Sequence, residues 1–140
     1  MTSSKASIQI GLSSLYVDQL QGRPAFVALL RQAQASLSVI AQEMDATVKN
    51  SRIKGVPMSL HVETRRDAEK TRFLRWYGYG KNRTWESFAD DLGALTAPMR
   101  RHYEQLNRRA RELNTLSMLL QHTVRKLESH LDKRLEQTTI

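Results

Sequence analysis

The sequence contains no cysteine, only three prolines and six glycines, and no long apolar run. Because disulfides, zinc–thiolate sites and thiol catalysis all require cysteine, these three classes are excluded. No apolar run approaches the roughly 18 residues that a membrane-spanning helix needs, and residues 1–5 lead into no signal-peptide segment. We therefore expect a single domain over residues 1–140 that acts in the cytoplasm without membrane contact.

Acidic residues are also scarce: 14 Asp and Glu stand against 22 Lys and Arg, which leaves a net charge of +8. The imbalance is concentrated in residues 51–83, which hold nine basic and three acidic side chains. The residues before them carry four and three, and those after them nine and eight. A solvated helical surface usually mixes both signs, whereas a one-sided cluster attracts polyanions. Residues 51–83 are therefore the segment that we expect to bind a polyanion.

A stripe of apolar residues in steps of three and four predicts an amphipathic helix over residues 24–49. Pro24 suits the first turn of this helix, where its missing N–H is not needed. The stripe consists of Phe26, Leu30, Ala33, Leu37, Ile40, Met44 and Val48. Upstream, the first ten residues are expected to fray, and a shorter helix is expected around Leu12, Leu15, Tyr16 and Leu20.

A heptad repeat from Met99 to Leu131 predicts a second, longer helix over residues 98–136. Leucine stands at every seventh position of its seam, as Leu106, Leu113, Leu120 and Leu127. We expect the seam to pack antiparallel against the first helix. The part that the first helix does not reach is left for a second copy of the chain or a protein partner.

Between the two helices the apolar spacing falls to two, which predicts a two-stranded β-hairpin over residues 56–80. Pro57 near its start favours an edge position. One face of the second strand carries Arg72, Leu74 and Trp76, and the other carries Thr71, Phe73, Arg75, Tyr77 and Tyr79. We expect the second strand to end at Gly78, Gly80 and Asn82, and Thr84 to cap a short helix over residues 84–95.

These elements predict a mainly α protein with a small β-hairpin, an α+β fold. Its two long helices would form an antiparallel helical hairpin or coiled coil, interrupted by the β-hairpin and the short helix.

The predicted hairpin combines cations with aromatic rings, a mixture typical of nucleic-acid surfaces. Cations neutralise phosphates and release counterions, while rings stack on unpaired bases; an exposed ribbon also fits a major groove. The candidate nucleic-acid-binding residues are Arg65, Arg66, Lys70, Arg72, Phe73, Arg75, Tyr77, Tyr79, Lys81 and Arg83. The alternative interpretation is that Leu74 and Trp76 pack on the helices while the arginines only keep the hairpin soluble.

A second basic stretch lies near the start of the long helix, at Arg100, Arg101, Arg108, Arg109 and Arg111. A phosphate backbone could lie along it. Glu104 and Glu112 interrupt it, however, and opposite signs three and four residues apart equally predict a solvated flank with ion pairs.

Nothing in the sequence predicts catalysis or a metal site. The histidines are not spaced four apart, as metal-binding pairs on a helix often are: His61, His102, His122 and His130. Glu86 and Asp90 would suit a divalent-metal nuclease, but capping and solvation of a short helix explain them more simply. No Gly-x-Ser-x-Gly is present, and the turn at residues 78–81 lacks the spacing of a phosphate loop. We expect no enzyme, no metal and no cofactor.

Two strings of residues resemble those of a known family. They are Thr71-Arg72-Phe73-Leu74-Arg75-Trp76, and Arg111-Glu112-Leu113-Asn114 followed by Leu116-Ser117-Met118-Leu119-Leu120 and His122. The family is an uncharacterised one encoded by integrating conjugative elements and related plasmids, and some of its members are described as integrase regulators. The resemblance covers about residues 70–127, and its motifs are packing residues rather than a catalytic signature. It implies a bacterial mobile element and a setting of DNA transfer, excision or replication.

The sequence therefore favours a non-enzymatic nucleic-acid-binding accessory or regulatory protein of a bacterial mobile element, with DNA as a more expected ligand than RNA. The alternative is a coiled-coil interaction module whose long helix binds an acidic or helical protein partner. Its interface would be Leu106, Leu113, Leu120 and Leu127.

Overall fold

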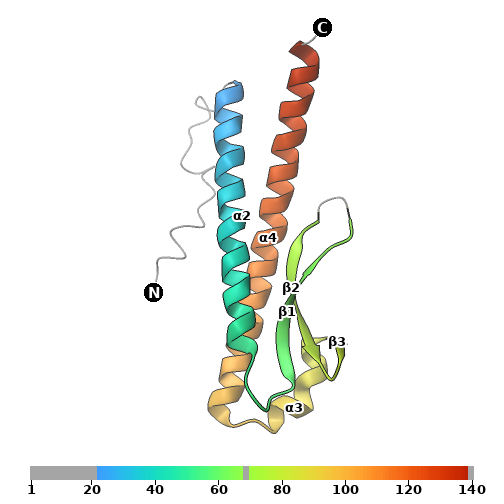
Figure 1. Cartoon of the computed structure of the whole chain (residues 1–140). Helices are drawn as coiled ribbons and strands as arrows, with labels where there is room; N and C mark the ends of the chain where they lie inside the picture. The colour runs from blue at the N-terminus through green and yellow to red at the C-terminus, as the bar shows by residue number, and fades with distance from the viewer. Residues whose placement is uncertain (1–21, 68–69, 139–140) are drawn as a thin grey trace. The chain divides into compact units, whose positions relative to one another are not determined.

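The computed structural model describes residues 22–67 and 70–138 (Figure 1). The short helix expected around residues 12–20 and the fraying of the first ten residues lie outside this part. The described elements are α2 (Arg23–Ser51), β1 (Met58–Thr64), β2 (Arg72–Gly78), β3 (Lys81–Arg83), the 3₁₀ turn η2 (Trp85–Phe88), α3 (Ala89–Gly93) and α4 (Ala97–Thr138). The protein is thus mainly helical with a small antiparallel sheet, as predicted. None of the described helices has the length and apolar character needed to cross a membrane.

The described residues divide into two compact units. The first contains residues 23–40 of α2 and residues 118–138 of α4. Within it, Arg23 Nη1 donates to the carbonyl oxygen of Leu131 at 3.4 Å, and the rings of Phe26 and His130 lie 4.4 Å apart. These contacts place the start of α2 beside the end of α4 in this unit.

The second unit contains residues 41–117, and its core lies between the helices and one face of the sheet. Trp76 of β2 is at the centre of this core. Its ring lies 6.0 Å from that of Tyr103 and 5.9 Å from that of Phe88, and all three side chains are buried. Figure 1 shows β1 and β2 beside the first part of α4, with α3 at the end of the sheet where β3 lies.

The seam predicted on the long helix is buried. All nine seam residues after Met99 have exposed fractions of 8% or less: Tyr103, Leu106, Ala110, Leu113, Ser117, Leu120, Val124, Leu127 and Leu131. Met99 itself is half-buried. The heptad repeat therefore identified the buried face of α4 correctly.

The stripe predicted on the first helix is only partly right. Its members Ala33, Ile40, Met44 and Val48 are buried, whereas Phe26, Leu30 and Leu37 are half-buried. Leu29 and Ser36 are buried one position earlier, at 5% and 2% exposure. The apolar count left out Ser36 because serine was not counted as a core residue, and it placed Leu30 rather than Leu29 in the stripe.

A buried serine also joins the end of α2 to β1. Ser51 Oγ donates to the carbonyl oxygen of Val48 at 2.6 Å and accepts the main-chain N–H of Leu60 at 2.8 Å. Tyr103 Oη donates to the carbonyl oxygen of Ser51 at 3.2 Å. Because buried polar groups need partners, these bonds fix how β1 enters the unit.

The sheet has three strands in the order β1-β2-β3, whereas the sequence predicted two. Thr64 pairs with Arg72 and Met58 with Gly78 in the first hairpin, and Gly78 pairs with Lys81 in the second. Tyr79 and Gly80 form the second turn, with φ angles of 54° and 77°. A two-residue hairpin turn with both φ angles positive matches the twist of the strands. The second strand ends at Gly78, as predicted, but Gly80 turns the chain back into a third strand, Lys81–Arg83, that the sequence did not predict.

The segment after β3 is a 3₁₀ turn followed by the short helix α3, and the expected cap is absent. Thr84 stands at the N-cap position, but its side chain makes no capping hydrogen bond. Instead, Ser87 Oγ donates to the carbonyl oxygen of Thr84 at 2.6 Å. The turn brings Phe88 under Gly78, so close that a Cβ at Gly78 would lie 2.9 Å from the Phe88 ring.

Candidate nucleic-acid interface

Side chains of α4 complete the free edge of β2. Since β3 pairs only with residues 76–78, the edge of β2 before them has no neighbouring strand. The side chain of Asn114 takes the place of a neighbouring strand. Its Oδ1 accepts the N–H of Leu74 at 2.6 Å, and its Nδ2 donates to the carbonyl oxygen of Leu74 at 3.0 Å. Ser117 Oγ donates to the carbonyl oxygen of Arg72 at 2.8 Å. Main-chain groups that would otherwise lack partners are thus satisfied.

A third polar residue of α4 holds the inner face of β2. Trp76 Nε1 donates to Asn107 Oδ1 at 2.9 Å. The sequence analysis did not single out Asn107 or Asn114, although each stands beside the leucine seam at a position where a polar side chain faces the sheet. These bonds fix which face of β2 points to the helices and which points to solvent.

The outer face of the sheet carries the side chains that alternate with the core residues. From the register, Ser59 lies opposite Tyr77, His61 opposite Arg75, and Glu63 opposite Phe73. Arg75 and Tyr77 are exposed, and Phe73 and His61 are half-buried. The rings of His61 and Tyr77 meet edge to face at 5.2 Å. The structure therefore brings Phe73, Arg75 and Tyr77 together on one face, as the alternation predicted.

Glu63 is the acidic group of this outer face. Its Oε1 lies 2.8 Å from His61 Nε2, and its Oε2 lies 3.6 Å from Arg75 Nη1. The hydrogen bond from His61 lowers the pKa of Glu63 below its ordinary value, and the charge of Arg75 lowers it further. Glu63 is thus ionised at neutral pH and offsets part of the charge of Arg75.

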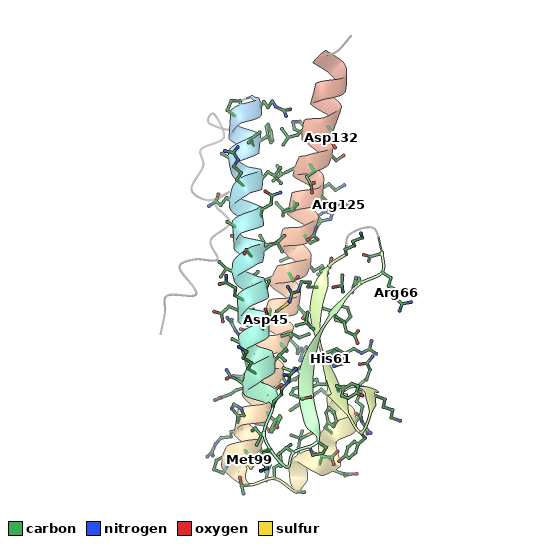
Figure 2. All side chains as sticks on the ribbon, viewed as in Figure 1. Asp45, His61, Arg66, Met99, Arg125 and Asp132 are labelled. Atoms are coloured by element: carbon green, nitrogen blue, oxygen red, sulfur yellow. The ribbon has the colours of Figure 1, made fainter. Side chains whose placement is uncertain are left out.

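The tip of the first hairpin carries three exposed cations, Arg65, Arg66 and Lys70. Main-chain bonds shape the tip: the N–H of Arg65 donates to Thr71 O at 2.9 Å, and the N–H of Lys70 donates to Asp67 Oδ1 at 3.1 Å. Figure 2 shows the side chain of Arg66 pointing away from the sheet. No carboxylate within residues 22–66 and 70–132 forms an ion pair with any of the three cations, and Asp67 lies beside them in the tip.

Two of the predicted phosphate-binding residues, Arg72 and Arg83, contact other residues of the chain. Arg72 is on the inner side of β2, where its Nη2 lies 3.2 Å from Asp45 Oδ1 of α2. Arg83 Nε donates to Ser87 Oγ at 3.1 Å, and its guanidinium lies 5.2 Å from the ring centre of Tyr79 and 5.5 Å from that of Phe88. Lys81 is exposed in β3, and no described carboxylate forms an ion pair with it.

Tyr79 does not lie on the outer face with Phe73, Arg75 and Tyr77, where the alternation had placed it. It is in the second turn, and its Oη donates to Asp91 Oδ1 at 2.5 Å. This hydrogen bond raises the pKa of Tyr79 above its ordinary value, because it is lost when the phenol ionises. The alternation failed here because a turn residue with positive φ interrupts the period of two.

The basic stretch of α4 is likewise partly structural. Arg100 donates to the carbonyl oxygen of Leu92 within α3 at 3.3 Å and to that of Leu95, just after α3, at 3.4 Å. Arg109 lies 3.2 Å from Glu43 and 3.6 Å from Glu112. The exposed cations of this stretch that have no described acidic partner are Arg101, Arg108 and Arg111.

The leucines proposed for a partner interface are buried within the chain. Leu106, Leu113, Leu120 and Leu127 have exposed fractions of 7%, 0%, 0% and 8%. By contrast, Met118 and Leu119 of α4 are 45% and 52% exposed. A protein partner that binds α4 in this conformation would therefore meet Met118 and Leu119 rather than the seam.

No group of three or more metal-ligating side chains occurs within residues 22–67 and 70–132. Glu86 and Asp90 are both exposed.

No protein-family model matches the chain, and no curated protein or solved structure matches it either. The function must therefore be inferred from the geometry and charge of the sheet and its tip.

Proposed function

We propose that the protein is a non-enzymatic nucleic-acid-binding accessory protein that grips phosphates through the tip of its first hairpin. The observation that supports this most is the group of three exposed tip cations, Arg65, Arg66 and Lys70. Lys81 and Arg75 extend the positive surface along the sheet. DNA is the first ligand to test, and the setting of a bacterial mobile element rests on the sequence resemblance alone.

The energetic basis of the proposal is counterion release. Each phosphate that a lysine or arginine neutralises lowers the slope of log affinity against log salt by about 0.9 on duplex DNA and about 0.7 on a single strand. Arg72 and Arg83 have partners within the chain, which leaves five cations if Arg75 exchanges Glu63 for a phosphate: Arg65, Arg66, Lys70, Arg75 and Lys81. We therefore expect a slope of about −4.5 on a duplex or about −3.5 on a single strand.

The test is a salt titration of binding with the full chain and fluorescently labelled oligonucleotides, read by anisotropy. The variant R65A/R66A/K70A removes the tip cations. The matched control R31A/R125A/K126A removes three exposed cations from the first unit. We expect the tip variant to lose about 10- to 1,000-fold in affinity at low salt and about 2 to 3 in slope, and the control to lose little.

Two outcomes would contradict the proposal. One is that the unaltered chain binds neither single-stranded nor duplex nucleic acid at low salt. The other is that both triple variants lose affinity equally, since that result would reflect net charge rather than the tip.

The buried seam supports a finer architecture within the same proposal. Its residues are buried in each unit, as expected if α2 and α4 pair as the antiparallel helical hairpin that the heptad repeat predicts. Such a hairpin would present the sheet and its tip to a ligand.

A protein-interaction module remains the second candidate, and the exposed Met118 and Leu119 favour it. Large apolar side chains side by side in water are the usual anchors of a helical partner. Under this alternative, replacing both residues with Ser should abolish assembly with the partner, while R65A/R66A/K70A should leave it intact.

A further inference from the structure

The outer face of the sheet carries more aromatic surface than folding requires. An outward face of an antiparallel sheet is usually polar. Here Phe73 and Tyr77 of β2 lie on it, while Leu74 and Trp76 already fill the core from the opposite face. Tyr77 is 37% exposed, and its hydroxyl makes no hydrogen bond within the described part of the chain.

We propose that this outer face stacks unpaired bases, so that the ligand is a single-stranded nucleic acid. This deepens the proposed function and rests on it. The platform is defined as His61, Phe73, Arg75 and Tyr77. Flat rings offer stacking faces to any base, and exposed arginine beside them attracts the phosphates that link the bases.

The spacing of the platform suits a strand that runs along β2. Phe73 and Tyr77 are four residues apart on one face, a separation of about 13 Å at about 3.3 Å per residue. Arg75 stands midway between them on the same face. A strand stacked on both rings would therefore pass the guanidinium of Arg75, and His61 supports the Tyr77 ring through an edge-to-face contact.

A duplex fits this platform poorly. In a duplex each base already stacks on its neighbours, so the rings of the platform find no base face and would meet only sugar and phosphate. The tip cations, by contrast, attract phosphates of either form. The aromatic face therefore distinguishes the two forms, whereas the tip does not.

The experiment compares affinities for a labelled single strand, the duplex of the same sequence and the corresponding RNA strand at one salt concentration. We expect the unaltered chain to bind the single strand at least tenfold more tightly than the duplex. Tyr77→Ala and Phe73→Ala should each weaken single-strand binding by about 5- to 150-fold, the range that loss of one stacked base gives. Duplex binding should be unchanged.

Two further variants separate stacking from folding. Tyr77→Phe keeps the ring and should keep single-strand affinity. Tyr79→Asn removes a ring from the second turn, where Asn tolerates the positive φ, and should also leave single-strand affinity unchanged. Thermal unfolding of each variant verifies that it is folded.

The outcomes distinguish this inference from the proposed function. Equal or tighter binding of the duplex, or an unaltered single-strand affinity in a folded Tyr77→Ala variant, would overturn the stacking platform. Either result would leave intact the proposal that the tip cations bind phosphates. Absence of binding to every nucleic acid would overturn both.

Discussion

The two faces of β2 differ in what their side chains contact, although they belong to the same seven residues. On the inner face, Trp76 packs against the rings of Tyr103 and Phe88 and donates its indole N–H to Asn107. On the outer face, Tyr77 touches His61 edge to face and leaves much of its ring in water. Strand alternation therefore places neighbouring aromatic residues in different environments, one in the core and the other on the face that we propose binds a ligand.

The difference between the two faces of β2 is tested most strongly by truncating Trp76 and Tyr77 in separate variants. Trp76→Ala should lower the free energy of unfolding by about 3–5 kcal/mol, because it empties the centre of the core. Tyr77→Ala should lower it less, by about 1–2 kcal/mol, since Tyr77 is 37% exposed. Chemical denaturation of both variants measures the difference. Equal losses would mean that Tyr77 is a structural residue and that the outer face is not free for a ligand.

A smaller effect is expected where α4 completes the sheet edge. Asn114→Ala should destabilise the protein by about 2–3 kcal/mol, because it leaves the N–H and the carbonyl oxygen of Leu74 without partners. Thr115→Ala is the matched control: its hydroxyl bonds only to the carbonyl of Arg111 within α4, and its exposed position predicts a change within about 0.5 kcal/mol. If the two variants unfold at the same denaturant concentration, α4 does not supply the edge of β2.

The smallest effect is expected at Glu63, the acid of the outer face. Glu63→Gln removes the charge that competes with phosphates for Arg75, so single-strand affinity should rise a few-fold. An unchanged or weakened affinity in a folded variant would show that Arg75 does not meet the ligand. Salt dependence measured beside it should become slightly steeper, because Arg75 is then fully available.

Glu63 also predicts a pH dependence of stability. Its pKa in the folded protein lies below the ordinary value of 4.5, so its carboxylate stabilises the fold above about pH 4.5. That contribution is lost as the pH falls through the lowered pKa. In melting experiments the difference between the unaltered chain and Glu63→Gln should therefore shrink below pH 4.5. A difference that is constant across this range would contradict the ionic role of Glu63.

The periodic parts of the fold could be predicted from the sequence, and the parts set by turn geometry could not. The heptad repeat of α4 identified its buried residues because apolar spacing reports directly on burial. The third strand was missed because Tyr79, a bulky residue, adopts the positive φ that usually marks glycine or asparagine. Nothing in the local sequence predicts that choice.

The sequence predicted which residues make up the candidate site but not which of its cations contact other parts of the chain. Charge counting found the cationic segment, and alternation placed Phe73, Arg75 and Tyr77 together. It did not show that Asp45 pairs with Arg72, because this contact joins segments 27 residues apart that only the tertiary fold brings together. It also missed the bond from Arg83 to Ser87, which is local but depends on the conformation of the turn after β3. The sequence therefore overestimated the number of cations available to a ligand.

The most direct test of the account is to map where a nucleic acid touches the protein. Amide and side-chain resonances of the labelled full chain should be recorded by NMR while a short single-stranded DNA is added. The account predicts that the shifts concentrate at the tip cations Arg65, Arg66 and Lys70 and at Phe73, Arg75 and Tyr77 on the outer face. Shifts that instead concentrate around Met118 and Leu119, or no shifts at saturating DNA, would contradict it.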